Sequence, residues 1–338
     1  MRSVVFVVNR TLVRDPRGFG RRCLAAARNF GWEPLLAETG PGESGLGLAH
    51  RAVADGAGLV FAAGGDGTVR ACAQALAGTG VPLAIVPLGT ANLTARALGI
   101  PARTGPAIDV GFRGRNHRID LASAELGRAA EGRAAEGRAA EGSSADEASA
   151  SPILFAAMAG IGLDAAVVEA AHAEGKRRLG WVAYAMSGVA HLSLPPREFT
   201  VRLDGGEPLV RRARCVVVGN AGLLPGGFWL LPEARCDDGW LDVGILAPTG
   251  VLGWPRVAGL VLTRSRRADG QLERFRARRV EISAAMDLPR QVDGEVIAPG
   301  RSLTVSVRPG VLTVRLGTKG QTGAGTTARS GKERRVVE

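Results

Sequence analysis

The sequence predicts an α/β protein with a parallel-sheet domain at the N-terminus and an antiparallel sheet or sandwich after it. Three observations lead to this prediction. In the first third of the chain, all-apolar strand patterns alternate with helical patterns, which is typical of a parallel sheet. From about residue 119, short strand patterns separated by turn residues take over. The length of 338 residues also favours about two domains.

The N-terminal elements follow in strand and helix order. Each predicted strand is apolar along its whole length, as expected of a parallel strand that is covered on both faces. In chain order we expect strand 4–8, helix 20–30, helix 49–54, strand 58–63, helix 69–77, strand 83–86 and helix 91–98. Gly99 and Pro101 end the last of these helices.

The second half shows many short strand patterns and one long helical pattern over 164–194. The strands are expected over 119–123, 153–157, 199–203, 214–219, 241–246, 280–283 and 303–307. A repeated Gly-Arg-Ala-Ala-Glu segment has no apolar stripe, so we expect a flexible, solvated insert over residues 127–150. We therefore place domains at residues 1–118 and 119–310, and expect residues 311–338 to form a last strand and a disordered basic tail.

Charge and cysteine usage narrow the class of protein. Lys and Arg number 43 against 32 Asp and Glu, a formal net charge of +11, which attracts anionic lipids or nucleotides. Nucleic acid is not an expected partner, because aromatic residues make up only 4% and the arginines are scattered. The four cysteines form no C-x-x-C pair, so we expect neither disulfides nor a zinc site. No apolar run reaches the ~20 residues of a membrane helix, and we expect a cytoplasmic protein.

Two glycine turns carry the strongest chemical signal. Ala63-Gly64-Gly65-Asp66-Gly67-Thr68 leaves a strand pattern and enters a helix, and Val86-Pro87-Leu88-Gly89-Thr90-Ala91-Asn92 does the same. Glycines let the backbone approach a ligand closely, and exposed N–H groups at a helix start suit phosphate. Turns at neighbouring strand ends would line one crevice. The alternative is an ordinary glycine turn in which Asp66 only caps the helix.

These two segments, with others that follow in order, resemble the diacylglycerol kinase catalytic-domain family, which includes sphingosine and ceramide kinases and bacterial lipid kinases. The likeness spans roughly residues 4–310 without the insert. It continues through Asn9, through Ala159-Gly160-Ile161-Gly162-Leu163-Asp164-Ala165, through Asn220 with Gly226-Gly227, through Pro232–Val243, and through Gln291-Val292-Asp293-Gly294-Glu295. It implies a three-layer Rossmann-like (NAD kinase/phosphofructokinase-like) domain followed by an antiparallel β-sandwich domain.

The resemblance also implies a catalytic site with ATP in the inter-domain cleft. Asp293 would be the general base, and Glu295 would bind the catalytic Mg²⁺ together with Asp66. On the residues alone, Val292-Asp293-Gly294-Glu295 is more typical of a hairpin turn. The residues implied for ATP binding are Asn9, Gly64, Gly65, Asp66, Gly67, Thr68, Gly89, Thr90 and Asn92.

A structural Mg²⁺ site is implied near residue 238. Asp238 resembles the family's ligand, with the backbone carbonyls of Arg235 and Trp240 beside it, and oxygen ligands suit a hard cation. Asp-Asp-Gly between two strands is also ordinary turn chemistry, so both interpretations stay open here. Asp164 is likewise either a functional residue or a helix cap.

The sequence therefore predicts an ATP- and Mg²⁺-dependent lipid kinase that phosphorylates the hydroxyl of a diacylglycerol-like or sphingoid lipid. Its partner would be a lipid at the membrane surface, with peripheral membrane association, and an exposed edge of the second sheet could mediate a homodimer. One alternative is an NAD kinase-type phosphotransferase, but the Asn-Glu pair of that family is not found. The other is a non-catalytic lipid- or nucleotide-binding protein, which would have no need of a base at Asp293.

Overall fold

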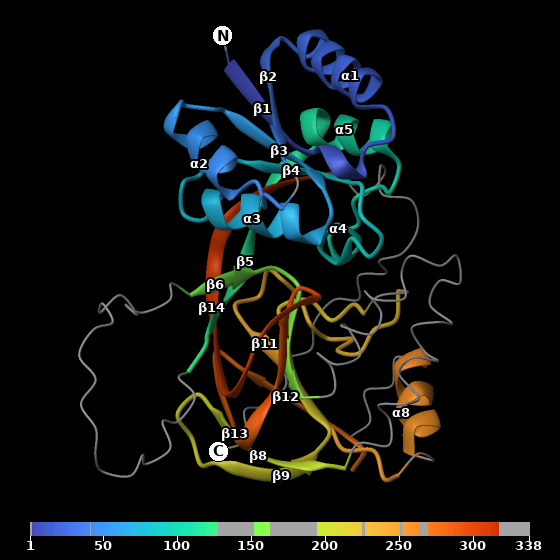
Figure 1. Cartoon of the computed structure of the whole chain (residues 1–338), viewed down its shortest axis with the longest axis vertical. Coiled ribbons are helices and arrows are strands. Elements are labelled where there is room, and N and C mark those ends of the chain that lie inside the picture. Colours follow the sequence, from blue (N-terminus) through green and yellow to red (C-terminus); the bar gives the residue numbers. More distant parts are fainter. Residues whose placement is uncertain are drawn as a thin grey trace, which may run out of the picture.

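The computed structural model describes residues 2–40, 42–127, 152–162, 195–224, 227–250, 253–263 and 270–317. Two parts lie one above the other, with the N-terminal helices around the upper sheet and the strand-rich part below (Figure 1). The predicted helix over 164–194, nearly all of the predicted insert and the basic tail beyond residue 317 lie outside the described residues.

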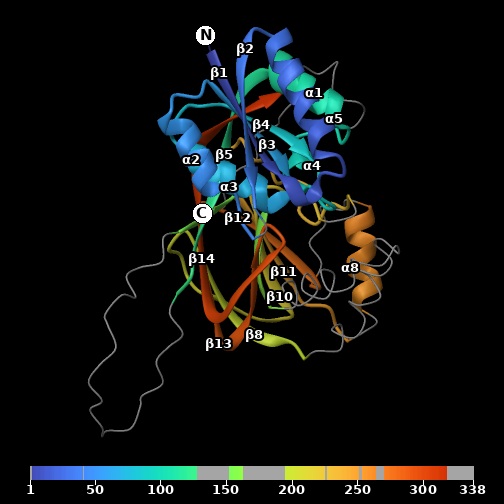
Figure 2. The same ribbon diagram turned by 45° about the horizontal axis from the view of Figure 1, so that its top comes forward.

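Four parallel strands form the N-terminal sheet in the order β2-β1-β3-β4. Helix α1 packs against α5, and α2 packs against α3, so the helices form two separate layers (Figures 1 and 2). The strands are β1 (Arg2–Asn9), β2 (Trp32–Thr39), β3 (Leu59–Gly64) and β4 (Leu83–Pro87), and the helices are α1 (Pro16–Asn29), α2 (Leu46–Ala54), α3 (Asp66–Leu76), α4 (Leu93–Ala97) and α5 (Thr104–Arg113). A short 3-10 turn, η1 (Arg10–Leu12), follows β1.

Stacked aromatic rings fill one face of this sheet. Phe6 of β1 and Phe61 of β3 have ring centroids 4.5 Å apart, and Phe112 of α5 lies 4.9 Å from Phe61. Val7, which follows Phe6 in β1, points to the opposite face of the sheet because side chains alternate along a strand. It lies toward the layer of α2 and α3, where a Cβ at Gly45 would come 2.9 Å from it. The predicted three-layer arrangement is thus confirmed.

Besides the short turn η1, two N-terminal elements were not expected from the sequence. Strand β2 carries Glu33, Pro34 and Glu38, and it pairs only with β1 among the described strands. Charged residues and proline are tolerated at such a sheet edge, and they interrupt the apolar pattern that indicates a strand. Helix α5 contains Gly105 and Gly111, which weaken its helical pattern.

The second part is an antiparallel β-sandwich, as predicted. Its strands pair in the order β12-β11-β10-β7-β13-β14, while β8 and β9 extend from β13, and β5 and β6 extend from β14. The elements are β5 (Arg115–Glu125), β6 (Ile153–Phe155), β7 (Met158–Gly162), β8 (Arg197–Leu203), β9 (Leu209–Ala213), β10 (Cys215–Gly219), β11 (Leu241–Leu246), α8 (Gly253–Leu262), β12 (Leu272–Ala277), β13 (Arg279–Val292) and β14 (Glu295–Leu316).

One long strand joins the two parts. Strand β14 pairs with β13 and β5, and near its end Val314 pairs in parallel with Leu83 of β4. Figure 1 shows it running from the lower sandwich up to the N-terminal sheet. Strand β5 runs beside it along most of this course. The expected domain limits at residues 118 and 310 fall inside β5 and β14, and they stay predictions.

Helix α5 offers a matched test of its packing against the sheet. A Cβ at Gly111 would lie 2.2 Å from the Phe61 ring, whereas a Cβ at Gly105 would meet nothing within 4 Å. We expect Gly111→Ala to lower the free energy of unfolding by about 1–3 kcal/mol through overpacking. Gly105→Ala should be neutral or stabilise by up to about 1 kcal/mol. Urea unfolding measures both, and equal midpoint shifts would contradict this packing.

Candidate active site

The two glycine turns lie in contact at the carboxyl ends of β3 and β4. The Leu88 amide donates to the carbonyl of Gly64 over 2.9 Å. A Cβ at Gly89 would lie 2.7 Å from the Cα of Gly65, and a Cβ at Gly64 would lie 2.4 Å from Oγ1 of Thr68. Gly89 therefore permits a close approach of the two backbones, and Gly64 leaves room for the Thr68 side chain.

Asn92 closes the second turn. Its side-chain amide donates to the Gly89 carbonyl over 2.6 Å, and its Oδ1 accepts from the Gly89 amide at 3.0 Å. Its φ of 47° lies in the left-handed region, which Asn tolerates better than most residues. The helix expected over 91–98 consequently starts only at Leu93. Thr90, which was predicted to contact the nucleotide, is exposed at the tip of this turn.

Helix α3 starts directly at the first turn and brings three predicted residues together. Asp66 and Gly67 occupy its first turn, and Thr68 is buried behind them. Asn9, at the end of β1, donates from Nδ2 to Oγ1 of Thr68 over 3.5 Å. The ends of β1, β3 and β4 thus meet at one edge of the sheet, where the N–H groups at the start of α3 are available to an anion.

Asp293 lies in the two-residue turn between β13 and β14. Val292 pairs with Glu295 across this turn, and Asp293 and Gly294 have φ values of 48° and 78°. Positive φ at both central residues is typical of a type I′ hairpin turn, for which Asp-Gly is a preferred pair. The segment is therefore both the hairpin turn that the residues alone indicate and the segment implied by the family resemblance.

Three backbone amides hold the Asp293 carboxylate. Oδ1 accepts from Ala157 at 2.9 Å and from Met158 at 3.0 Å, and Oδ2 accepts from Ala156 at 3.1 Å. This explains why the strand expected over 153–157 is wrong in extent. It ends at Phe155, and Ala156 and Ala157 turn their N–H groups to Asp293 before β7 begins.

Burial and hydrogen bonding act on Asp293 in opposite directions. The residue is only 6% exposed, and this burial raises the pKa of its carboxyl group above the usual value. The three amides and the charge of Arg70 lower the same pKa. An ionised carboxylate has about four acceptor positions, so three amides leave about one position, on Oδ2, for another donor.

The charge of Asp293 acts on the carboxyl group of Asp66. The pKa of Asp66 is raised to about 6, first by burial and second by the charge of Asp293. Amides of α4 lower it, and the Thr94 N–H donates to Oδ1 of Asp66 over 3.4 Å. The late carboxylate thus influences a residue of the early glycine turn, and two like charges in one buried region favour a cation near them.

Arg70 of α3 contacts the same hairpin turn. Its NH1 donates to the Val292 carbonyl over 3.2 Å, and its NH2 forms an ion pair with Glu295. The Glu295 side chain is 59% exposed, whereas that of Arg70 is 17% exposed. Sequence reasoning missed Arg70, because nothing in the pattern separates it from the many other arginines of the chain.

Oxygen ligands at this edge fit a magnesium ion. Mg²⁺ usually takes one or two protein carboxylates and completes its shell with substrate phosphates and water. Asp66 could supply such a carboxylate, whereas a cation at Glu295 would have to displace Arg70. Within the described ranges, no group of three or more His, Cys, Asp or Glu side chains could hold a metal without such added ligands. The roles of both residues stay predictions.

Asn220 and Asp120 support the backbone that holds Asp293. Asn220 is fully buried and donates from Nδ2 to the carbonyls of Ala156, at 3.0 Å, and Asp120, at 2.9 Å. The Asp120 carboxylate accepts from the amides of Gly310 and Gly239, both at 2.7 Å. Asp120 was also missed, although an acidic residue inside the apolar strand pattern over 119–123 is a usable signal.

At the predicted structural Mg²⁺ site, the charged side chains form ion pairs with each other. Asp238 accepts from the Trp240 amide at 3.1 Å and forms an ion pair with Arg276. Arg235 pairs with Asp237 at 3.0 Å. A cation at Asp238 would have to displace Arg276, and the site stays a prediction. Asp164, the other open assignment, lies outside the described residues.

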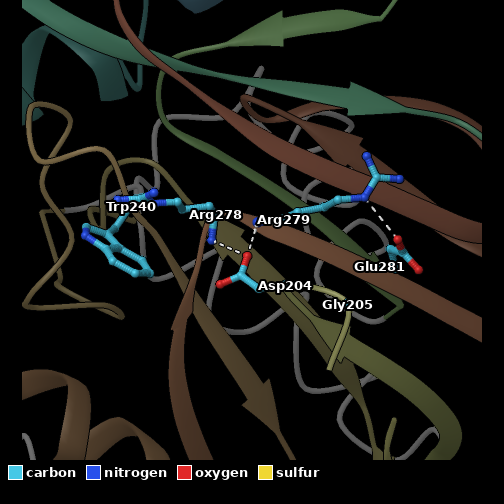
Figure 3. Close-up of a pocket in the computed structure, with 6 residues that line it drawn as sticks. All are labelled: Asp204, Gly205, Trp240, Arg278, Arg279 and Glu281. Atoms are coloured by element: carbon cyan, nitrogen blue, oxygen red, sulfur yellow. Dashed lines mark hydrogen bonds and ion pairs between the residues drawn. The ribbon is translucent and has the colours of Figure 1, made fainter. Parts of the chain in front are cut away.

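A shallow pocket of about 670 Å³ lies elsewhere, on the β-sandwich (Figure 3). Figure 3 shows the Arg278 side chain at the Trp240 ring, and its guanidinium lies 4.8 Å from the ring centroid. Arg279 pairs with Glu281 at 3.0 Å, and Asp204 accepts from the backbone of Arg278 and Arg279. The charged side chains that line this pocket are therefore largely engaged by neighbouring groups of the protein.

Comparison with known families agrees with this architecture. The diacylglycerol kinase catalytic domain matches residues 4–124, and the YegS C-terminal NAD kinase beta sandwich-like domain matches residues 157–316. A probable lipid kinase YegS-like from Pseudomonas aeruginosa is 33% identical over 308 residues, covering 88% of this chain and 89% of the relative. The chain belongs to the diacylglycerol kinase family, with the YegS-like lipid kinases. The family resemblance of the sequence is thereby confirmed.

Other members and neighbours of this lipid kinase family extend the match. A probable lipid kinase YegS-like from Pseudomonas syringae pv. tomato is 32% identical over 309 residues, covering 88% of both chains. The crystal structure of a diacylglycerol kinase from Bacillus anthracis has a TM-score of 0.69 at 20% identity, covering 93% of this chain and 97% of that one. Yeast NADH kinase shares the fold at a TM-score of 0.51 and 10% identity, covering 98% of this chain and 90% of that one. Among the described residues, no helix is both long and apolar enough to cross a bilayer.

The raised pKa of Asp66 predicts a pH-dependent stability in the absence of metal and nucleotide. Its folded-state pKa of about 6 lies above the ordinary 3.8, so the folded state binds this proton more tightly. The resulting stabilisation is complete below about pH 4 and is lost as the pH rises through about 6.

We therefore expect Asp66→Asn to raise the free energy of unfolding at pH 7.5 by about 1–3 kcal/mol, with the difference from wild type vanishing near pH 4. Urea unfolding in a chelator at several pH values measures it. Asp109→Asn, at an exposed position of α5, controls for the loss of a surface charge. If the free energies of unfolding of Asp66→Asn and wild type differ equally at pH 7.5 and near pH 4, the raised pKa of Asp66 is contradicted.

Proposed function

We propose that this protein is an ATP- and Mg²⁺-dependent lipid kinase that transfers a phosphoryl group to the hydroxyl of a diacylglycerol-like or sphingoid lipid. One observation carries the proposal: the hairpin turn of Asp293, whose carboxylate is held by three amides, is hydrogen-bonded through Arg70 to α3, the helix that begins with Asp66 at the first glycine turn. Phosphoryl transfer needs positioned phosphates, a cation and a carboxylate within reach of the attacking hydroxyl, and little other help from the protein.

The residues divide this work between the two parts of the molecule. The glycine turns and the start of α3 bind the phosphates through backbone N–H groups, because both present amides without side chains in the way. Mg²⁺, when bound, would neutralise charge on the phosphates. The free acceptor position on Asp293 takes the proton of the lipid hydroxyl, while that oxygen bonds to the γ-phosphorus and ADP leaves.

The fixed carboxylate of Asp293 also supports catalysis over mere binding. A base must be ionised before transfer and must hold its orientation, and three amide donors serve both needs. A protein that only binds nucleotide or lipid gains nothing from a buried carboxylate opposite a second one. We further propose peripheral membrane association in the cytoplasm, because a net charge of +11 favours an anionic bilayer surface.

The substrate assay should separate the lipid kinase from its rivals. Purified protein is incubated with γ-labelled ATP, Mg²⁺ and vesicles that carry diacylglycerol, sphingosine or ceramide, with NAD in a parallel reaction. Label in an organic-soluble product supports the proposal. Label only in NADP would replace it with an NAD kinase; the fold of this chain is also that of a yeast NADH kinase. Retained ATP binding without transfer to any acceptor would favour a non-catalytic protein.

The assigned base can be tested by a near-isosteric change. Asp293→Asn should lower turnover by about 10³-fold or more while leaving ATP binding within about threefold, because the glycine turns are untouched. The new amide would face the Ala156 N–H, so thermal unfolding should accompany the assay to show that the variant is folded. Asp109→Asn is the matched control. If a folded Asp293→Asn variant turns over near the wild-type rate, Asp293 is not the general base.

A further inference from the structure

We propose that Arg70 is a positioning residue that fastens the catalytic hairpin turn to the nucleotide-binding helix. The proposal rests on the proposed function, because it concerns how the residues of that site are held in register. Arg70 belongs to α3, whose first residue is Asp66, whereas the turn it contacts belongs to β13 and β14 of the sandwich. Among the described residues, its side chain spans the space between the two halves of the site.

The helix geometry directs Arg70 to this position. Asp66 and Arg70 are four residues apart, so they lie on the same face of α3. Side chains of a helix tilt toward its N-terminus, which brings the guanidinium of Arg70 back toward the level of Asp66. The face of α3 that presents Asp66 to the site therefore also presents Arg70 to the hairpin turn.

Arg70 contacts the hairpin turn on both sides of Asp293. On one side NH1 donates to the carbonyl of Val292, the residue before Asp293, over 3.2 Å. On the other side NH2 pairs with the carboxylate of Glu295, two residues after it. A planar guanidinium can hold two acceptors at a fixed separation, which an ammonium group cannot do. The rigid guanidinium of Arg70 consequently binds the turn both at its backbone and at the Glu295 side chain.

The contacts are better suited to positioning than to stability. Glu295 is 59% exposed, and ion pairs with such an exposed partner contribute about 0–1 kcal/mol to folding. The reacting groups, however, must meet within a few tenths of an ångström, and a misplacement of about 1 Å can cost about 100-fold in rate. A weak contact that fixes Asp293 relative to the phosphates can therefore matter greatly for turnover and little for the fold.

The test compares three variants of the full-length protein. Arg70→Met removes both contacts but keeps a long, unbranched side chain of similar packing. Arg70→Lys keeps the charge and one donor direction but loses the fork. Arg211→Met removes an ion pair of the same type, with Glu273 at 2.9 Å, on the far β8–β9 hairpin, and is the matched control.

Two measurements are made on each variant. Hydrogen–deuterium exchange of the peptide covering residues 291–297 reports how firmly the turn is held, whether or not any lipid is phosphorylated. Steady-state kinetics with the lipid found in the substrate assay give kcat and the KM for ATP separately. Thermal unfolding of all three variants excludes a general loss of structure.

We expect Arg70→Met to exchange at residues 291–297 at least about threefold faster than wild type. Its kcat should fall about tenfold or more, with the KM for ATP changed by less than about threefold. Arg70→Lys should recover part of the loss in kcat, and Arg211→Met should match wild type in both measurements.

Unchanged exchange in Arg70→Met would overturn the proposal even if the protein proves to be a lipid kinase. A rise in the KM for ATP with an unchanged kcat would also overturn it, because Arg70 would then bind nucleotide instead of positioning the turn. If wild type phosphorylates no lipid, the proposed function fails, and faster exchange in Arg70→Met would still show that Arg70 holds the turn.

Discussion

The site depends on three backbone N–H groups that converge on one carboxylate. Ala156, Ala157 and Met158 donate to Asp293, and this requires the chain to leave strand geometry between β6 and β7. Asn220 in turn holds the Ala156 carbonyl, so the break is itself supported from the sandwich core. An anion in a buried position is costly unless its lone pairs are satisfied, and here backbone amides satisfy about three of them.

This constraint explains why the two halves of the chain act on one another. The sandwich holds the Asp293 carboxylate in place, and the N-terminal sheet positions the glycine turns. The charge of Asp293 nevertheless alters the pKa of Asp66. In the proposed function, a bound cation would offset this effect of one carboxylate on the other. The same burial that raises both pKa values would strengthen every interaction with a bound nucleotide, because charges attract more strongly where water is excluded.

The sequence predicted most of what periodicity and turn chemistry can encode. Apolar runs located β1, β3 and β4, and the glycines after β3 and β4 marked the edge where the strands end. The family resemblance, and not the pattern, pointed to Asp293, since Asp-Gly between strands reads only as a turn. Arg70 and the ending of β6 at Phe155 were not predictable, because both follow from contacts made across more than one hundred residues of chain. Strand β2 was hidden by its charges and proline at the sheet edge.

Strand β14 has a mechanical consequence for how the two halves are joined. Paired strands, not a loose linker, connect the two halves, because β14 and β5 run together from the sandwich to the N-terminal sheet. Any change in the angle between the two halves would have to bend or twist this two-stranded ribbon. Its pairing is interrupted between Arg308 and Leu312, and Gly310 in that gap has a φ of 57° and donates to Asp120. Such a distortion would meet the least backbone pairing at this irregularity, which Gly310 links to Asp120 in the network that supports the Asp293 carboxylate.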